Sequence, residues 1–243
     1  MRGSASPPPG AATGTEIWVP VAWESSGGAT PSAGASTGLP MTGVAGLLRP
    51  GDSGPQVLAL QQRLAALGYW AGTPDGRYGE VTAQAVTALQ KVAGLDRDAV
   101  AGPRTRAALD AGVRPRARSS SGHVVEIDLA RQVLLIVDAG RVSTVLNVST
   151  GSGEYYQTPG GGRGHAVTPP GHYRVFRSVD GWDTSPLGHL YRPRYFNGGI
   201  AVHGYPSVPP FPASHGCVRV SLPAMDMIWS DDLLPVRGTV WVY

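Results

Sequence analysis

The stretch Ser214-His-Gly-Cys-Val-Arg219 holds the only cysteine of the sequence, Cys217. Upstream of it, the apolar segment Ile200-Ala-Val-His-Gly204 is typical of a short strand and carries a histidine, His203. Residues 205–213, a loop that four prolines stiffen, join the two segments. A thiol with two histidines within fifteen positions is sufficient for nucleophilic catalysis, so this region constrains both the fold and the chemistry.

The chemistry of a thiol decides what its neighbours must supply. A free cysteine has a pKa of ~8.5, so only about 3% of it is thiolate at neutral pH. His203 is the candidate general base, because a strand end can hold its ring. Lowering the thiol pKa gains only a few-fold in rate, since a less basic thiolate is a weaker nucleophile. Positioning and oxyanion donors must supply the rest, and Gly216 with the N–H of Cys217 and its neighbours are the candidates.

The residues alone leave other interpretations open. A lone cysteine is more often a small buried hydrophobe than a nucleophile. His203, His215 and Cys217 offer three metal ligands, but no CxxC or HExxH spacing supports a metal site, and we predict none. The triple glycine at 160–162 is followed by neither Gly-Lys-Ser/Thr nor a helix, so we expect residues 151–164 to be a flexible loop.

Composition excludes several classes of protein. The 243 residues suffice for one large domain or two small ones. The net charge of +3, from nineteen arginines and one lysine against seventeen acidic residues, is too small and too scattered to indicate nucleic-acid binding. No apolar run approaches the ~18 residues of a membrane span. The first ten residues lack the apolar core of a signal peptide.

The N-terminal half divides by composition. Residues 1–43 are rich in Gly, Ser, Ala, Thr and Pro and predict a disordered leader or linker. Residues 44–112 predict a small all-α domain of three helices. The first two helices are indicated by apolar residues at helical spacing, namely Val57, Leu60, Leu64 and Leu67, then Val81, Ala85, Leu89 and Val92. The third follows Gly102-Pro103, and Leu60-Gln61 and Leu89-Gln90 echo each other weakly.

A set of Gly, Leu-Gln and Asp-Gly positions runs through this helical segment: Leu48-Arg-Pro-Gly-Asp-Ser-Gly-Pro-Gln-Val57, Leu60-Gln61, Leu67-Gly-Tyr69, Asp75-Gly-Arg-Tyr-Gly79, Leu89-Gln90 and Gly94-Leu95. The pattern resembles the peptidoglycan-binding module of the three-helix type. The resemblance implies attachment to the cell wall, and the alternative is a spacer domain that binds nothing. Asp98-Ala-Val-Ala-Gly102 departs from the Asp-Gly turn of that family, so we expect the third helix to begin differently.

Residues 113–122 form a basic linker, which we interpret as a solvated spacer. From 123 to 243 the periodicity is that of strands, and it predicts a β-rich, sandwich-like domain with one short helix. Residues 172–179 read as one strand, and Ser221 as the N-cap of the helix. The chain is therefore predicted to be multidomain, with the three-helix segment first and the β-rich domain second.

The two opening segments resemble the signature of the L,D-transpeptidase (YkuD-like) catalytic domain. Tyr195-Phe-Asn-Gly-Gly199 and Thr168-Pro-Pro-Gly171 also match, and the resemblance covers about residues 122–243. It implies that Cys217 is the nucleophile and His203 the general base, oriented by the Gly204 carbonyl. It further implies supporting or oxyanion roles for His215, Gly216, Gly204 and Ser214. Substrate contacts are expected from Arg219, Tyr195 and Asn197, with a structural ion pair as the alternative for Arg219.

The resemblance implies a function without metal or organic cofactor. Cys217 would attack the donor stem peptide of peptidoglycan, release D-alanine as a thioester forms, and pass the acyl group to an acceptor stem. Carbapenem-type β-lactams would acylate the same thiol. Alternatives are an L,D-carboxypeptidase, in which water takes the acyl group, and a non-catalytic wall-binding protein. The substrate implies a location in the cell envelope, outside the cytoplasmic membrane.

Overall fold

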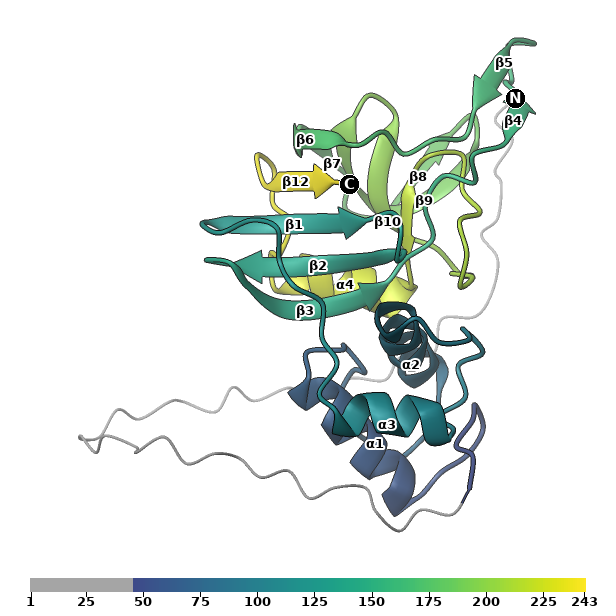
Figure 1. The fold of residues 1–243 in the computed structure, drawn as a ribbon. Coiled ribbons are helices and arrows are strands. Elements are labelled where there is room, and N and C mark those ends of the chain that lie inside the picture. The colour runs from purple at the N-terminus through teal and green to yellow at the C-terminus, as the bar shows by residue number, and fades with distance from the viewer. Residues whose placement is uncertain (1–45) are drawn as a thin grey trace, which may run out of the picture. The chain divides into compact units, whose positions relative to one another are not determined.

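The computed structural model describes residues 46–243, and the predicted leader at 1–43 lies outside the described residues. Within the described part are four helices and a β-rich domain (Figure 1). This confirms the prediction of a helical segment followed by a β-rich domain with one short helix. No helix in residues 46–243 is both long and apolar enough to cross a membrane.

Three helices form the N-terminal part of the described chain: α1 (Pro55–Ala66), α2 (Glu80–Ala93) and α3 (Pro103–Asp110). Proline opens α1 and α3, where its missing N–H costs nothing and its fixed φ suits the first turn. Gly94 ends α2 in the left-handed conformation, at φ +66°. The helices lie within the segment that the periodicity predicted.

A buried glutamine holds the turn between α1 and α2. The Gln61 Nε2 donates hydrogen bonds to Asp75 Oδ1 (2.9 Å), to the Arg77 carbonyl (3.0 Å) and to Thr82 Oγ1 (2.9 Å). Its Oε1 accepts from the N–H of Gly76 at 2.8 Å. The side-chain amide therefore fixes the turn and the first turn of α2 together.

A second glutamine repeats this arrangement between α2 and α3. The Gln90 Nε2 donates to Asp98 Oδ1 (2.7 Å), to the Val100 carbonyl (3.1 Å) and to Thr105 Oγ1 (3.3 Å). Its Oε1 accepts from the N–H of Ala99 at 3.0 Å. The weak echo of Leu-Gln in the sequence is therefore a structural repeat. The Asp98 turn keeps the bonding of the earlier turn, and α3 follows Gly102 as α2 follows Gly79, against our expectation that the third helix would begin differently.

The helices do not close a core of their own, because strands of the first sheet complete it. Val133, Leu135 and Val137 of β2 and Val145 of β3 pack with the buried residues of α1, α2 and α3. The chain after α1 also pairs with β3, since the Trp70 N–H donates to the Val145 carbonyl at 3.2 Å. This pairing covers a sheet edge that would otherwise be open.

The first sheet has the strand order β3-β2-β1-β12-β6. Its strands are β1 (His123–Asp128), β2 (Val133–Asp138), β3 (Arg141–Asn147), β6 (Gly171–Arg174) and β12 (Thr239–Val242). β12 lies parallel to β1 and antiparallel to β6, so the end of the described chain occupies an interior position of this sheet.

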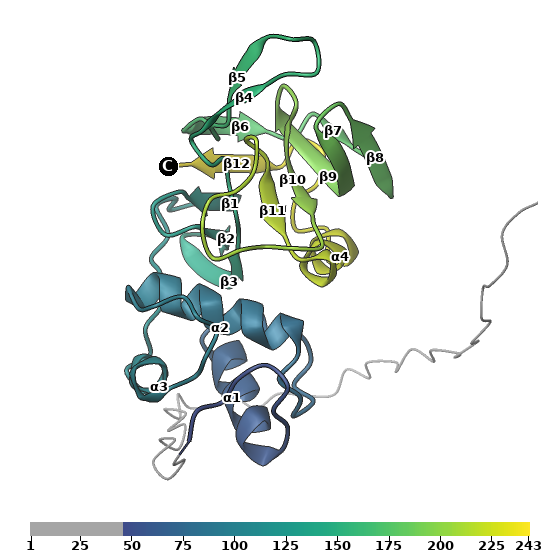
Figure 2. The same ribbon diagram turned by 90° about the vertical axis from the view of Figure 1, so that its right-hand side faces the viewer.

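The second sheet has the order β11-β10-β9-β7, with β8 also paired to β9. Its strands are β7 (Arg177–Ser178), β8 (Trp182–Ser185), β9 (Gly188–Asn197), β10 (Ile200–Gly204) and β11 (Val218–Val220). One apolar core joins both sheets and the helix α4 (Leu222–Ser230). The helix lies beside the second sheet (Figure 2). Ser221 caps α4 as predicted, since its Oγ accepts from the Ala224 N–H.

Two predictions about the strands and loops of the β-rich domain were wrong. The single strand expected at 172–179 is two strands, β6 and β7, in different sheets. The chain changes sheet at its midpoint, where the Val175 N–H donates to Gly238 and the Phe176 N–H donates to Tyr195. The loop at 151–164 contains β4 (Tyr155–Gln157) and most of its antiparallel partner β5 (Arg163–His165), so it is not wholly irregular.

The linker at 113–122 is anchored and is not a loose spacer. The buried carboxylate of Glu126 accepts from the N–H of Arg118 and from the N–H and hydroxyl of Ser119. The Tyr243 hydroxyl donates to the same carboxylate at 2.8 Å. Burial alone would raise the pKa of Glu126, but these hydrogen bonds outweigh it and the pKa is lowered. The carboxylate thus ties the linker to the end of the described chain.

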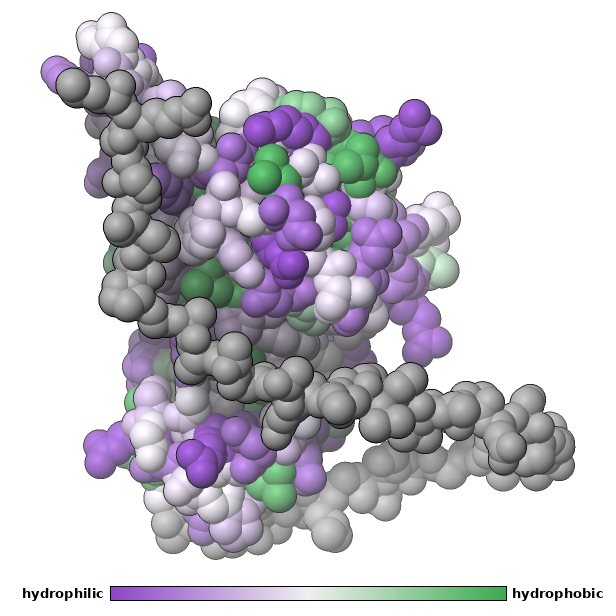
Figure 3. Space-filling model, turned by 180° about the vertical axis from the view of Figure 1, so that it is seen from behind, coloured by the Kyte–Doolittle hydropathy of each residue, from purple (hydrophilic) through white to green (hydrophobic). Residues whose placement is uncertain are grey.

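On the face seen in Figure 3, hydrophobic residues form separate green patches among hydrophilic ones. The exposed large apolar side chains of the described residues are spread along the chain: Leu47, Tyr155, Phe176, Trp182, Leu187, Phe211 and Val236. Scattered exposed apolar residues are normal for a globular surface and indicate no site on their own.

The repeat predicts that Ala99→Gly stabilises the protein. Gly76 and Ala99 occupy matching turn positions with φ of +74° and +57°. The left-handed conformation costs a non-glycine residue roughly 1–2 kcal/mol, of which the greater freedom of unfolded glycine returns part. We expect the free energy of unfolding to rise by up to about 1 kcal/mol, measured by urea denaturation of the full chain. Gly76→Ala is the reverse control and should lower it; a loss of stability in Ala99→Gly would contradict the interpretation.

Candidate active site

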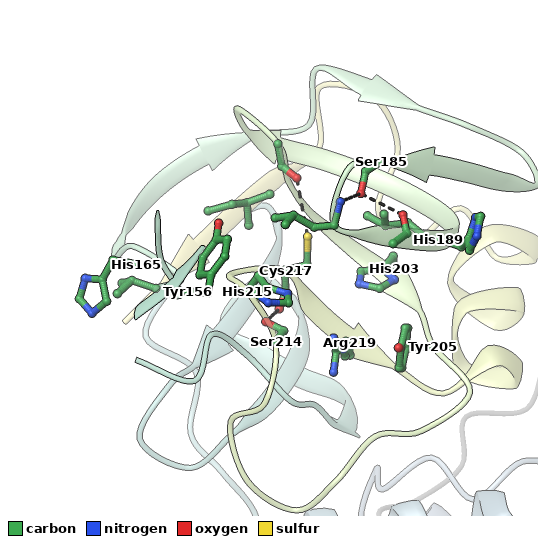
Figure 4. A pocket seen from close by; sticks show the side chains of 16 residues that line it. Tyr156, His165, Ser185, His189, His203, Tyr205, Ser214, His215, Cys217 and Arg219 are labelled. Atoms are coloured by element: carbon green, nitrogen blue, oxygen red, sulfur yellow. Dashed lines mark hydrogen bonds between the residues drawn. The ribbon is translucent and has the colours of Figure 1, made fainter. Parts of the chain in front are cut away.

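A cleft of about 320 Å³ opens beside the second sheet and contains both Cys217 and His203 (Figure 4). Its walls come from β4, β5, β8, β9, β10 and β11 and from the loops around them. The lining residues are Tyr156, His165, Val167, Ser185, Leu187, Gly188, His189, Leu190, Gly199, Ile200, His203, Tyr205, Ser214, His215, Cys217 and Arg219. The sequence-predicted pair therefore faces one cavity.

Cys217 directly precedes β11, which pairs in parallel with β10. Its side chain is partly buried against Leu190, Tyr195 and Ala201. The sulfur lies 3.6 Å from the Gly199 carbonyl oxygen. Burial raises the pKa of the Cys217 thiol, although the Ala201 backbone and the Arg219 charge act in the opposite direction. The resting side chain is therefore a thiol and not a thiolate.

His203 lies in β10 and is 3% exposed. Its Nδ1 lies 2.9 Å from the carbonyl oxygen of Gly204. A carbonyl can only accept, so Nδ1 carries the proton and Nε2 holds the free lone pair. Burial lowers the pKa of His203 to about 4, and the Arg219 charge acts in the same direction. The imidazole is therefore neutral, with one nitrogen oriented and the other able to accept a proton.

The turn before Cys217 is locked by hydroxyl groups. The Ser214 Oγ donates to the Cys217 carbonyl at 2.6 Å and accepts from the Gly216 N–H at 3.0 Å. The Thr168 Oγ1 donates to the Gly216 carbonyl at 2.6 Å. The N–H of Gly216 is thus already bonded to Ser214. It is therefore not available as an oxyanion donor, so this one of the candidate amides around Cys217 is excluded. Ser214 acts on the shape of the turn.

Two glycines of the signature stand where a side chain would not fit. Gly216 has φ +138°, and a Cβ there would lie 2.9 Å from the Val167 carbonyl oxygen. At Gly204, a Cβ would lie 2.8 Å from Tyr191 Cδ1 and 3.1 Å from Met225 Cβ. The backbone approaches closely at both positions, which explains the glycines without assigning them chemistry.

Arg219 lies on the wall of the cleft and has no ion-pair partner within residues 46–243. Its guanidinium lies 4.1 Å from the centre of the Tyr205 ring. One of its nitrogens donates to the Ala213 carbonyl at 3.2 Å, and its buried Nε has no partner among the described residues. The alternative of a structural ion pair therefore finds no carboxylate in this part of the chain.

Of the other predicted site residues, His215 lines the cleft, whereas Tyr195 and Asn197 do not. His215 is exposed on the wall, with its ring against Tyr156 at 4.5 Å. Tyr195 is 6% exposed and its hydroxyl donates to Asp183 at 2.8 Å. Neither Tyr195 nor Asn197, at the end of β9, is among the lining residues. The structure does not bring these two to the cleft, because Tyr195 packs into the core behind Cys217.

Several lining residues were not predicted. Tyr156 and His165 come from the ribbon, and Ser185 and His189 come from the β8–β9 hairpin. No spacing pattern marks them, since they meet the cleft only once the strands have paired. The lining contains an arginine and four histidines but no Asp or Glu. Such a cleft suits a ligand that carries negative charge.

Within residues 46–243, no group of three or more His, Cys, Asp or Glu side chains is placed to hold a metal ion. The proton on the His203 Nδ1 points to a backbone carbonyl, which leaves one ring nitrogen for chemistry. The arrangement offers a thiol, a neutral imidazole and a guanidinium in one cavity. Those groups can perform nucleophilic attack, proton transfer and binding of an anion.

Comparison with known proteins places the chain in a family. The model of the L,D-transpeptidase catalytic domain, YkuD, matches residues 122–242. The model of a peptidoglycan binding domain matches residues 53–109. A solved L,D-transpeptidase from Xylanimonas cellulosilytica DSM 15894 is 52% identical, with a TM-score of 0.79 over 82% of this chain and 98% of that one. The chain belongs to the YkuD L,D-transpeptidase family and has a peptidoglycan-binding domain ahead of the catalytic domain, which confirms both resemblances.

Two curated proteins share a shorter region with the chain. N-acetylmuramoyl-L-alanine amidase CwlL of Bacillus licheniformis is 47% identical over 79 residues, which is 31% of this chain and 22% of that protein. A probable N-acetylmuramoyl-L-alanine amidase of the same organism is 45% identical over 67 residues, which is 27% of this chain and 19% of that protein. The chain spans only about a fifth of the length of these relatives.

The neutral state of the pair predicts the pH dependence of Cys217 alkylation. A raised thiol pKa and a lowered imidazole pKa leave no thiolate–imidazolium pair at rest. The rate of alkylation by iodoacetamide should therefore rise with pH and reach its midpoint above the ~8.5 of a free thiol. Mass spectrometry of the full chain measures the rate, with a cysteine-containing peptide as control. A plateau of reactivity between pH 5 and 7 would show a preformed ion pair and contradict this expectation.

Proposed function

We propose that this chain is a cysteine-dependent L,D-transpeptidase that cross-links peptidoglycan stem peptides. Membership of the family supports transpeptidase or peptidase activity on peptidoglycan. The observation that carries the finer assignment is the hydrogen bond from the His203 Nδ1 to the Gly204 carbonyl. It leaves Nε2 as the free base in the cleft that contains the only thiol.

In the proposed acylation, the Cys217 sulfur attacks the carbonyl carbon of the diamino acid residue in the donor tetrapeptide. The His203 Nε2 takes the thiol proton as the C–S bond forms. The tetrahedral intermediate then breaks its C–N bond, and the imidazolium returns the proton to the leaving amine of D-alanine. Proton transfer must accompany attack, because both groups are neutral at rest. The product of this half-reaction is a thioester on Cys217.

In the second half-reaction, the amine of an acceptor stem attacks the thioester. His203 removes a proton from that amine, the C–S bond breaks, and the proton returns to the sulfur. The result is an amide cross-link and a regenerated thiol. No redox change and no cofactor enters either step. If water replaces the amine, the same steps give an L,D-carboxypeptidase.

We assign stabilisation of the oxyanion to the N–H groups of His215 and Cys217. The N–H of Gly216 is bonded to Ser214, and the N–H of Ser214 donates to the Thr150 carbonyl. A single well-placed donor is worth ~10²–10³ in rate. Arg219 is proposed to bind a carboxylate of the stem, since it has no acidic partner in the described part of the chain and lines an acid-free cleft.

The proposal predicts a covalent adduct of defined mass. Incubation of the reduced full chain with a stem tetrapeptide should add the mass of the stem less D-alanine, read by intact-protein mass spectrometry. Cys217→Ala and His203→Ala should abolish the adduct, because they remove the nucleophile and the base. His215→Ala should retain part of it, because that residue forms a wall. Carbapenem-type β-lactams should acylate the same thiol.

Absence of any adduct on the reduced wild-type chain would overturn the enzyme assignment and favour a non-catalytic wall-binding protein. Equal adduct formation in wild type and His203→Ala would overturn only the role of the base. Product analysis then separates the two reactions of the thioester. Cross-linked dimers indicate transpeptidation, whereas tripeptide without dimers indicates hydrolysis.

We further propose that the three-helix module retains the protein on the cell wall, outside the cytoplasmic membrane. The match to a peptidoglycan binding domain supports this role. The full chain with Cys217 alkylated, so that no covalent link can form, should sediment with isolated peptidoglycan. Bovine serum albumin is the non-binding control. A chain that stays in the supernatant would favour the spacer interpretation of the module.

A further inference from the structure

Helix α2 of the peptidoglycan-binding module contacts the loop that joins the two proposed catalytic residues. This loop, residues 205–213, leads from β10 toward β11 and runs next to α2 (Figure 2). The Arg97 Nη1, just after α2, donates to the Pro210 carbonyl at 2.9 Å. The Gln84 Nε2, in α2, donates to the Val208 carbonyl at 3.4 Å. Two side chains of the module thus reach the loop directly.

The composition of the loop explains why it is held in this way. Four prolines leave it few N–H groups of its own, so other parts of the chain must anchor it through its carbonyls. A further carbonyl anchor comes from the Ser149 hydroxyl, which donates to the Phe211 carbonyl at 2.8 Å. Asn147, the last residue of β3, links that strand to the module, because its side-chain amide donates to the Gln84 side-chain oxygen. The module and the residues at and just after the end of β3 therefore hold the loop by hydrogen bonds to its carbonyls.

Lys91, also in α2, makes a second set of contacts with the catalytic domain, outside the loop. It is 3% exposed, and its Nζ donates to the carbonyls of Gln132 (3.0 Å) and Val148 (2.8 Å). The Gln132 amide in turn donates to Thr150 Oγ1 at 2.6 Å, and its oxygen accepts from the Thr150 N–H. The Thr150 carbonyl then accepts from the N–H of Ser214 at 2.9 Å. A continuous chain of hydrogen bonds runs from α2 to the start of the cysteine turn.

We propose that α2 and the segment directly after it are a positioning element of the active site. Gln84 and Lys91 of α2 and Arg97 after it fix the loop that leads from His203 and the turn that carries Cys217. The peptidoglycan-binding module is then a working part of the catalytic site and not a separately tethered anchor. This inference rests on the proposed function, since it assigns these residues to the same reaction. The shared core of the helices and β2 keeps α2 in place for this role.

The buried amine of Lys91 can make these contacts in either protonation state. Burial lowers the pKa of Lys91 to about 7, and the nearby Arg97 charge adds to the effect. A neutral amine keeps two N–H groups, which matches the two carbonyls that it contacts. The hydrogen bonds from Lys91 to Gln132 and Val148 therefore persist when the amine loses its positive charge.

The test uses Arg97→Met and Gln84→Met, singly and together, in the full chain. Each removes a donor to the loop and leaves the core intact. Misplacement of reacting groups by about 1 Å can cost ~100-fold in rate, so we expect the double variant to be acylated by a carbapenem 10- to 100-fold more slowly. The concentration for half-maximal rate should change little. Arg97→Lys retains a donor and should restore most of the rate.

Arg104→Met is the matched control. It removes an exposed arginine of the same module, whose partner is the exposed Asp96. Its acylation rate should equal that of wild type. A double variant that is folded by circular dichroism yet is acylated at the wild-type rate would overturn the proposal, as would an equal loss in the control. Lys91→Met, if folded, should lose at least as much rate as Arg97→Met.

The two hypotheses fail in different ways. If the wild type is not acylated, the proposed function fails. The positioning role of the module is then tested by the alkylation of Cys217 with iodoacetamide. A changed environment of the thiol in the double variant should shift the pH midpoint of alkylation relative to wild type and Arg104→Met. Identical alkylation profiles in all three proteins would overturn the positioning role independently of any substrate.

Discussion

Burial of β2 on both faces is the constraint on which the rest of the structure depends. Alternate residues of the strand point to opposite sides, so Val133, Leu135 and Val137 pack with the helices while Leu134 and Ile136 pack with the second sheet. Neither core is complete without this strand. The helical module and the catalytic domain therefore share this strand as a common layer.

The cleft also depends on what burial does to its two reactive groups. Both the thiol and the imidazole are held neutral, because a low-dielectric site penalises charge on either. A neutral pair lacks the preformed thiolate that would react fastest. The rate of attack therefore depends on how precisely the thiol and the imidazole are positioned. The hydrogen bonds of Ser214 and Thr168 accordingly fix the backbone of the cysteine turn, and the bond to the Gly204 carbonyl orients the imidazole.

Local signals in the sequence predicted the helices, the Ser221 cap and the positions of Cys217 and His203, because each depends on near neighbours in the chain. The strand β9 escaped prediction, since Gly188–Asn197 contains a proline, two arginines and no alternation. It is stabilised by distant partners, among them the bond from Tyr191 to Asp226. His165 and His189 escaped for the same reason, as only strand pairing brings them to the cleft.

Lys91 is the only lysine in the sequence, and its amine is enclosed between α2 and the first sheet. The remaining nineteen basic side chains are guanidinium groups, which stay protonated and do not act as nucleophiles at ordinary pH. A protein proposed to carry an acyl group destined for an amine thus presents no side-chain amine of its own on the described surface. Transfer of the acyl group to a lysine of the protein itself is therefore prevented on the described surface, because the only lysine is buried.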